Sequence, residues 1–380
     1  MLTYGIHFSR LTNHELVFAQ IIPLAKKNNY EKKIKHFLKT EDVKSKVIPV
    51  YLKSPNSRFR NLLNPKILLT DFRSIFNTLK QLNPDVVICM YVLDAYPLAI
   101  LKSIFGYSLF VVATGGDINL RQGLVHKLVR NFIYKRCDLI FAVSNELTHK
   151  IKKESGCNSI IVPNPIDSLF FMPRIYEGNV REKWGLDQKD FVILTVCNLV
   201  KYKGVQIIIN AINALKNAVK HKVKLVVVGE GIEKKTLENL VVRLGLKQNT
   251  IFLGFRNREE LLELYNIADL FILASYSEGL PAVLLEAMAC ENVCISTDVG
   301  DVGRVITEGF NGFLVDSGNP MMLTKKIEEI FSLPEKKISS IRKQARKTVT
   351  KNYDFRNSTK IMMEMITLTF SRKTVDRMVN

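Results

Sequence analysis

The chain has 380 residues, 47% hydrophobic and 24% charged, so it is long enough for two domains and too apolar to be intrinsically disordered. No apolar run approaches the ~18–20 residues that span a bilayer, and the first 20 residues lack the unbroken apolar core of a signal peptide. Six scattered cysteines without a CxxC pair favour reduced core thiols in a cytoplasmic protein over a zinc site or a disulfide framework.

The formal net charge of +19 is unevenly distributed. Residues 1–172 hold 24 Lys+Arg against 12 Asp+Glu, a net +12, and nine lysines fall between Lys26 and Lys53. This excess of positive charge fits two alternatives equally well. The lysines form a solvated surface, or the protein makes peripheral contact with the anionic inner face of the cytoplasmic membrane. Nucleic acid is not expected as a partner, because no nucleic-acid-binding motif accompanies the charge.

In chain order, the first half alternates strand and helix patterns. The predicted strands are 2–8, 34–38, 47–51, 86–90, 109–113, 138–143 and 160–162, and the predicted helices are 15–27, 67–82, 97–104 and 124–135. Several of the strands are continuous apolar runs, as expected for parallel strands covered on both faces. Repeated strand–helix–strand order predicts a parallel sheet with right-handed crossovers.

Prolines at 163, 165 and 173 mark a stiff connection to a second α/β half. Its predicted strands are 191–196, 224–228, 250–253, 270–274, 294–297 and 312–315, and its predicted helices are 205–220, 233–244, 259–266, 282–290 and the tail 355–372. Ligands bind at the carboxyl ends of parallel strands, and domain interfaces are favoured positions for pockets. We therefore expect a binding cleft between two doubly wound halves.

The stretch 275–289 carries most of the functional information. It follows the apolar strand 270–274 and is predicted to form a glycine-containing loop and then a helix. Pro281 is tolerated in the first turn of this helix, because a residue there does not need a backbone N–H. The free N–H groups of Ala282 and Val283 would then form an anion site, helped by the helix dipole.

Two carboxylates flank this predicted anion site. Glu278 lies just before the helix and Glu286 about one turn inside it. Because a carboxylate that points at a phosphate repels it, both are expected to bind hydroxyl groups on either side. A phosphate flanked by polyols is the chemistry of a sugar nucleotide.

The spacing of these glutamates, within the words Glu278-Gly279-Leu280-Pro281 and Glu286-Ala287-Met288-Ala289-Cys290, resembles the EX7E motif of retaining glycosyltransferases of family 4, or glycosyl transferases group 1. The resemblance implies the α/β GT-B fold, in which two Rossmann-like doubly wound domains face each other across a cleft and a C-terminal helix crosses over. It implies an N-terminal acceptor-side domain of residues 1–168, completed by the crossover helix 355–380, and a C-terminal nucleotide-sugar-binding domain of residues 169–354.

Other loops of the second half resemble the family's donor site. Lys203 matches the lysine that contacts the donor diphosphate, where a fixed ammonium stabilises the charge of the leaving group. Asn198 stands where the family usually has arginine, and Gly254 with Phe255 matches the loop that holds the nucleobase. The implied donor-binding residues are Asn198, Lys203, Gly254, Phe255, Glu278, Gly279, Leu280, Pro281, Ala282 and Glu286.

In the first half, Thr114-Gly115-Gly116-Asp117 stands where the family often has His-Gly-Ser-Asp. Two glycines allow the backbone to approach a ligand closely, and Asp117 could bind a sugar hydroxyl. The implied catalytic residues are therefore Glu278, Lys203 and Asp117. The acceptor-side candidates are Ser9, Arg10, Thr114, Gly115 and Gly116.

The resemblance implies a hexosyltransferase that moves a hexose from a nucleoside diphosphate sugar to a sugar or lipid-linked glycan acceptor, with retention of anomeric configuration. It implies a role in the assembly of cell-envelope or extracellular polysaccharides or glycolipids, including lipopolysaccharide. No Asp-x-Asp motif appears in a suitable position, so neither a metal nor another cofactor is expected. Two alternatives remain open. A nucleotide-sugar 2-epimerase shares the GT-B architecture, and the replaced arginine and histidine also fit a non-catalytic donor-binding subunit.

Overall fold

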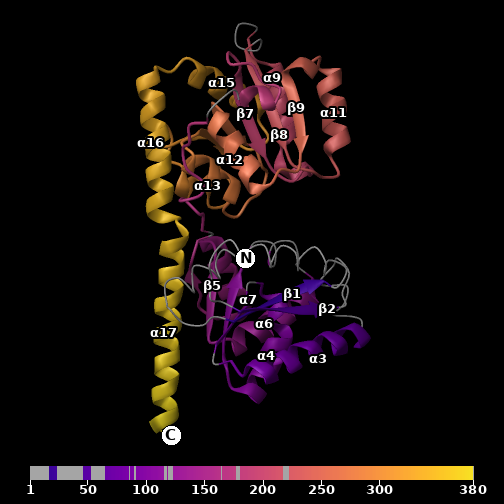
Figure 1. Ribbon diagram of the computed structural model, residues 1–380, viewed down its shortest axis with the longest axis vertical. Coiled ribbons are helices and arrows are strands. Elements are labelled where there is room, and N and C mark those ends of the chain that lie inside the picture. The colour runs from indigo at the N-terminus through magenta and orange to yellow at the C-terminus, as the bar shows by residue number, and fades with distance from the viewer. Residues whose placement is uncertain are drawn as a thin grey trace. The chain divides into compact units, whose positions relative to one another are not determined.

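The chain divides into two compact units (Figure 1). The first comprises residues 1–162 and 356–380, and the second comprises residues 163–355. The structure is a computed structural model that describes residues 17–23, 46–52, 65–84, 86–89, 91–114, 118, 123–163, 165–176, 180–216 and 222–379. The strands predicted at 2–8 and 34–38 lie outside these residues.

A parallel sheet in the order β3-β4-β5-β6 forms the centre of the first unit. Its strands are β3 (Val86–Cys89), β4 (Ser108–Ala113), β5 (Leu139–Ala142) and β6 (Ile160–Ile161). Its helices include α3 (Pro65–Leu82), α4 (Tyr96–Phe105), α6 (Leu124–Arg136) and α7 (Asn145–Ser155), with the short turn η3 (Leu93–Ala95) before α4. Every residue of β4 is buried, which explains its continuous apolar run.

The helix predicted over residues 15–27 is wrong. This segment contains β1 (Val17–Pro23), which pairs in parallel with β2 (Lys46–Leu52). Valine, isoleucine and phenylalanine favour a strand, because β-branched and aromatic side chains fit a pleated surface. Among the described residues β1 and β2 form a two-stranded sheet, so each is an edge strand, where a proline such as Pro23 is tolerated.

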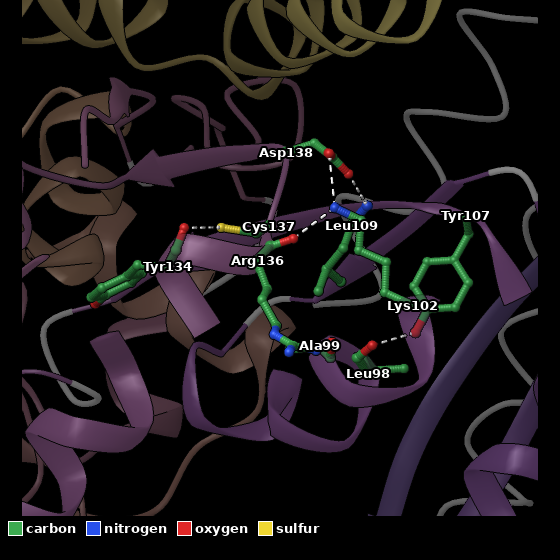
Figure 2. Close-up of polar contacts among 9 residues, drawn as sticks. All are labelled: Leu98, Ala99, Lys102, Tyr107, Leu109, Tyr134, Arg136, Cys137 and Asp138. Carbon is green, nitrogen blue, oxygen red and sulfur yellow. Dashed lines mark hydrogen bonds and ion pairs between the residues drawn. The ribbon is translucent and has the colours of Figure 1, made fainter. Parts of the chain in front are cut away.

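Polar contacts fasten the carboxyl end of α6 to its neighbours (Figure 2). Lys102 of α4 donates hydrogen bonds to the carbonyl oxygen of Arg136 at 2.6 Å and to Oδ1 of Asp138 at 2.8 Å. Oδ2 of Asp138 in turn accepts the N–H of Leu109 in β4 at 2.7 Å. The end of α6 is thereby held against both a helix and the sheet.

The second unit contains a parallel sheet in the order β12-β11-β10-β7-β8-β9. Its strands are β7 (Phe191–Val196), β8 (Val223–Val228), β9 (Thr250–Gly254), β10 (Leu270–Leu273), β11 (Val293–Thr297) and β12 (Phe313–Val315). From β7 the chain proceeds to one edge, and from β10 it proceeds to the other. This is the Rossmann strand order, and its topological switch point lies between β7 and β10.

The helices of the second unit follow the predicted alternation. They are α8 (Val180–Lys183), α9 (Val205–Asn213), α11 (Lys234–Arg243), α12 (Arg258–Ile267), α13 (Ala282–Ala289), α14 (Val302–Val305), α15 (Pro320–Phe331) and α16 (Glu335–Asn352), with the short turns η4 (Lys201–Lys203) and η5 (Lys247–Asn249). The sequence analysis did not identify the short helices α8 and α14 or the longer helices α15 and α16. Buried Ala345 and Val349 of α16 contribute to the core that also contains α13.

The last helix, α17 (Phe355–Val379), returns to the first unit. Its Met362 and Ile366 are buried in that unit's core, as expected for a crossover helix. The division between the units falls after Val162, whereas the sequence placed it after residue 168. Ile166 lies with the second unit because its N–H donates to Tyr353 and its carbonyl oxygen accepts the N–H of Phe355, both at 2.9 Å. No described helix has the length and hydropathy needed to cross a bilayer.

Candidate active site

The candidate site lies at the switch point of the second unit's sheet. The loop after β7 carries Lys203, and the loop after the neighbouring strand β10 carries Glu278. The carboxyl ends of both strands lie at the same edge of the sheet, where open α/β sheets bind their ligands. The strand order therefore brings together two residues that are 75 positions apart in the chain.

Backbone hydrogen bonds hold the loop after β10 from two sides. The N–H of Tyr276 donates to the carbonyl oxygen of Tyr202 at 2.8 Å, and the N–H of Asp301 donates to the carbonyl oxygen of Gly279 at 3.0 Å. Gly204 permits the first approach, because a Cβ at this position would lie 1.9 Å from the carbonyl oxygen of Ala274. The loop that carries Glu278 is thus fixed before any ligand binds.

We expect Gly204→Ala to destabilise the second unit strongly. Its φ of +69° costs a non-glycine residue about 1–2 kcal/mol, and the clash with the backbone of Ala274 adds about 1–3 kcal/mol. At about 2–4 °C per kcal/mol, thermal unfolding should show the loss as a lower Tm.

Gly245→Ala is the matched control for this prediction. Its φ of +68° is nearly the same, and no atom of the described residues lies within 4 Å of the added Cβ. It should therefore show the backbone strain without the clash. Equal Tm losses for the two variants would contradict a role for close packing at Gly204.

An ion pair occupies the centre of the site. Nζ of Lys203 lies 2.6 Å from Oε1 of Glu278, and the two side chains are only 15% and 9% exposed. The hydroxyl of Ser275, which is fully buried, donates to the same carboxylate oxygen at 2.6 Å. One oxygen of Glu278 is thereby fixed by a cation and a hydroxyl, whereas Oε2 has no hydrogen bond from the described residues.

Cys197 lies close to this pair but is not a thiolate. Burial raises the pKa of its thiol, the ammonium of Lys203 lowers it and the carboxylate of Glu278 raises it, and the net result is a pKa of about 12. A thiol with such a pKa is protonated at neutral pH, and the thiolate is the nucleophilic form. The raised pKa therefore disfavours Cys197 as a nucleophile.

The amino end of α13 faces the same loop. Pro281 caps the helix, and no acceptor among the described residues meets the N–H groups of Ala282 or Val283. No atom of the described residues lies within 4 Å of a Cβ built on Gly279, so the loop before the helix borders open space. Unpaired N–H groups at the positive end of a helix dipole bind anions.

Glu286, in the second turn of α13, is held from behind by Tyr265. The phenol of Tyr265 is buried and donates to Oε2 of Glu286 at 2.9 Å. Burial raises the pKa of Glu286, while this hydrogen bond and the charge of Arg258 lower it. Oε1 of Glu286 has no hydrogen bond from the described residues, so one carboxylate oxygen is fixed and the other remains available.

We expect Glu286→Gln to stabilise the second unit at neutral pH. Because the pKa of Glu286 is raised in the folded state, its contribution to stability is complete below the ordinary carboxyl pKa and is lost as the pH rises through the folded-state value. Removing the ionisable group should raise the Tm measured at neutral pH, by about 2–4 °C for each kcal/mol gained in the free energy of unfolding. The Tm measured at acidic pH, where Glu286 is protonated, should not change. Scanning calorimetry across this pH range measures both.

Tyr265→Phe is the companion variant. Removing its hydroxyl deletes a hydrogen bond that lowers the pKa of Glu286 and should cost about 1–3 kcal/mol, because a buried carboxylate loses its donor. A Glu286→Gln variant that is less stable than wild type at neutral pH would contradict this description of the carboxylate.

The remaining donor-side candidates lie at other loops of this edge. Gly254, at the end of β9, has a φ of +70° and accepts the N–H of Gly229 at 2.9 Å. Phe255 follows it and is 74% exposed, and Asn198 is exposed in the loop after β7. Leu280 and Pro281 are buried and shape the loop before α13.

The acceptor-side candidates belong to the first unit. Ser9, Arg10, Gly115, Gly116 and Asp117 lie outside the described residues. Thr114 is described, is partly buried, and directly follows β4, whose carboxyl end it extends. Its position fits the predicted loop, but the role of this loop remains a prediction.

Sequence reasoning missed two site residues, Ser275 and Tyr265. Ser275 lies within the quoted stretch, and its spacing of three residues from Glu278 is compatible with a turn-forming hydroxyl contact. Tyr265 is on α12, and its contact with Glu286 spans 21 positions and two helices. A buried tyrosine needs a partner for its hydroxyl, but the sequence does not show which one.

Comparison with solved structures gives the fold. The crystal structure of HepE from Anabaena in complex with UDP matches with a TM-score of 0.77 over 96% of this chain and 95% of that chain, at 18% identity. Together with the two Rossmann-like units, this match defines the class: the chain has the GT-B fold of glycosyltransferases.

The second unit carries the match to a family model. Residues 177–348 match the family described as glycosyl transferases group 1. The chain is 31% identical over 225 residues to N-acetyl-alpha-D-glucosaminyl L-malate synthase of Bacillus anthracis, covering 57% of each protein. It is 28% identical over 200 residues to UDP-Gal:alpha-D-GlcNAc-diphosphoundecaprenol alpha-1,3-galactosyltransferase of Escherichia coli, covering 51% of each. The matches thus span little more than half the length of these relatives.

Proposed function

We propose that the protein is a hexosyltransferase that moves a hexose from a nucleoside diphosphate sugar to a hydroxyl group of a glycan or lipid-linked acceptor. The observation that carries the proposal is the convergence of Lys203, Glu278 and the amino end of α13 at the switch point. A cation and free N–H groups suit a diphosphate, and a fixed carboxylate beside them suits a sugar hydroxyl.

Each group has a role in the proposed reaction. As the bond between the hexose and the diphosphate breaks, negative charge builds on the leaving phosphate, where Lys203 and the N–H groups of Ala282 and Val283 stabilise it. Glu278 accepts a hydrogen bond from a hydroxyl of the hexose, and Glu286 accepts one from the ribose. In the retaining course that we propose, the departing phosphate oxygen takes the proton of the acceptor hydroxyl, and Asp117 binds an acceptor-side hydroxyl.

The relatives support a UDP-sugar and a lipid-linked acceptor. The HepE structure contains UDP, and the name of the Escherichia coli relative specifies a UDP-sugar donor and a diphosphoundecaprenol-linked acceptor. A role in cell-envelope or extracellular glycan assembly, at the inner face of the membrane, is consistent with these names and with the basic first half of the chain.

The test is incubation of the purified protein with UDP-, GDP- and ADP-hexoses, with and without a membrane lipid extract as the acceptor source. We expect one donor to release its nucleoside diphosphate faster with the extract, to give a product of retained anomeric configuration, and to remain active in EDTA because Lys203 and α13 supply the positive charge.

Other results would favour the alternatives. A changed sugar without acceptor would identify a 2-epimerase. Donor binding without release of nucleoside diphosphate would identify a non-catalytic donor-binding subunit. Inhibition by EDTA with recovery on adding a divalent metal would contradict the proposed metal independence and leave the proposed transfer reaction unaffected.

A further inference from the structure

Helix α6 of the first unit presents an apolar face to solvent. Leu124, Val125 and Leu128 are 73%, 54% and 61% exposed. The side of the helix that faces the core instead includes a fully buried arginine, Arg130. The core side also contains the buried Ile133 and Tyr134, so α6 has apolar side chains on both sides, whereas the outer side of a surface helix is usually polar. We call Leu124, Val125 and Leu128 the α6 face.

The orientation of α6 is fixed by polar contacts on its other sides. Arg130 forms a two-pronged ion pair with Glu154 of α7, at 2.9 Å from Nε and 2.6 Å from Nη2. At the carboxyl end, Lys102 holds the carbonyl oxygen of Arg136, as Figure 2 shows. Rotating the helix to bury the α6 face would break both contacts, so the exposure of this face is built into the fold.

The charged side chains of α6 itself all have one sign, and an acid, Asp94, lies on the neighbouring turn η3. The helix contains Lys127, Arg130, Lys135 and Arg136 and no acidic residue. Of these, Lys127, Lys135 and Arg136 are exposed, and Arg130 is buried. On the adjacent helix α7 both acids are paired, Glu146 with Lys150 and Glu154 with Arg130. The face is therefore apolar with exposed cations beside it.

We propose that the α6 face, with Lys127 and Lys135, docks on an anionic phospholipid bilayer. Aliphatic side chains on one helix face enter the boundary between headgroups and acyl chains, while lysines extend to the phosphates. Each lysine near an anionic surface contributes about 1 kcal/mol to binding. A second copy of the chain is a poorer occupant, because a two-fold interface would place this basic helix against itself.

This inference rests on the proposed function for its biological role, since a bilayer contact brings the protein to a lipid-linked acceptor. The binding itself requires neither donor nor acceptor. It can therefore be measured separately from the transferase activity.

The experiment is sedimentation of the full-length protein with phosphatidylcholine vesicles, with and without phosphatidylglycerol. We expect binding only to the anionic vesicles, weakened by added salt. The double variant Leu124→Gln/Leu128→Gln should bind at least roughly tenfold more weakly, because it removes two inserted side chains. Lys127→Gln/Lys135→Gln should lose roughly tenfold to thirtyfold, at about 1 kcal/mol for each charge.

The control is Ile232→Gln/Val242→Gln, which changes two side chains of the second unit that are 86% and 63% exposed. It should bind vesicles like wild type, and an unchanged Tm should show that each variant folds. Equal binding by the Leu124→Gln/Leu128→Gln and control variants would overturn the proposal, as would absence of binding to anionic vesicles. A wild-type dimer that dissociates in the α6 variant without any change in vesicle binding would assign the face to self-association instead. Nucleoside diphosphate binding, measured in the same samples, tests the proposed function separately from vesicle binding.

Discussion

Lys203→Ala is expected to lower kcat/KM for the nucleoside diphosphate sugar by roughly 10²–10³-fold, the range typical for loss of one preorganised charge-stabilising group. The ammonium is only 15% exposed, so solvent screens it weakly, and its ion pair with Glu278 fixes its position. Because charge on the diphosphate increases as the sugar bond breaks, kcat should fall more than KM rises. Steady-state kinetics with saturating acceptor measures the two effects separately.

Lys201→Ala provides the matched control, because Lys201 belongs to the same short turn η4 but is exposed. Its kcat/KM should remain within a few-fold of wild type, as expected for a solvated charge. Similar losses for the two variants would show that the turn acts through its general positive charge, and the specific role of Lys203 would then be rejected.

Glu278→Gln is expected to lower kcat/KM by roughly 10²-fold or more, because the variant loses a charged hydrogen-bond acceptor for the hexose and the counter-charge that holds Lys203. The two residues are in direct contact, so their effects should not add. The double variant Lys203→Ala/Glu278→Gln should therefore be little worse than the poorer single variant. A double-mutant cycle measured by kcat/KM tests this coupling.

Glu259→Gln is a control for this variant, because Glu259 is an exposed glutamate in the first turn of α12. Its activity should equal that of wild type. Strict additivity of the Lys203 and Glu278 effects would be incompatible with the ion pair acting as one unit in the reaction.

Much of the second unit could be predicted from the sequence, because its information is local. The strand predicted at 191–196 matches β7, and residues 270–289 form the expected strand, turn and helix, with Pro281 directly before the helix. Buried parallel strands are continuous apolar runs, and the turn and the helix have their own characteristic residues. The order of these elements was then sufficient to predict the doubly wound sheet.

Two interactions inside the site could not be predicted, because they join residues far apart in sequence. Lys203 and Glu278 were both identified, but their ion pair depends on β7 and β10 being neighbours in the sheet. The contact between Tyr265 and Glu286 depends on how α12 packs near α13. The wrong helix over residues 15–27 has a related cause, since its strand β1 is defined by a partner that begins at residue 46.

The most direct measurement of the central claim is calorimetric titration of the wild-type protein and Lys203→Ala with UDP, GDP and ADP and with the corresponding monophosphates. The account predicts that one diphosphate binds, and that its monophosphate binds more weakly because it has one fewer phosphate to contact Lys203 and the amino end of α13. It also predicts that Lys203→Ala weakens diphosphate binding more than monophosphate binding. If no nucleoside diphosphate binds, or if the wild type and Lys203→Ala bind it equally, the assignment of this loop set as a donor site is contradicted.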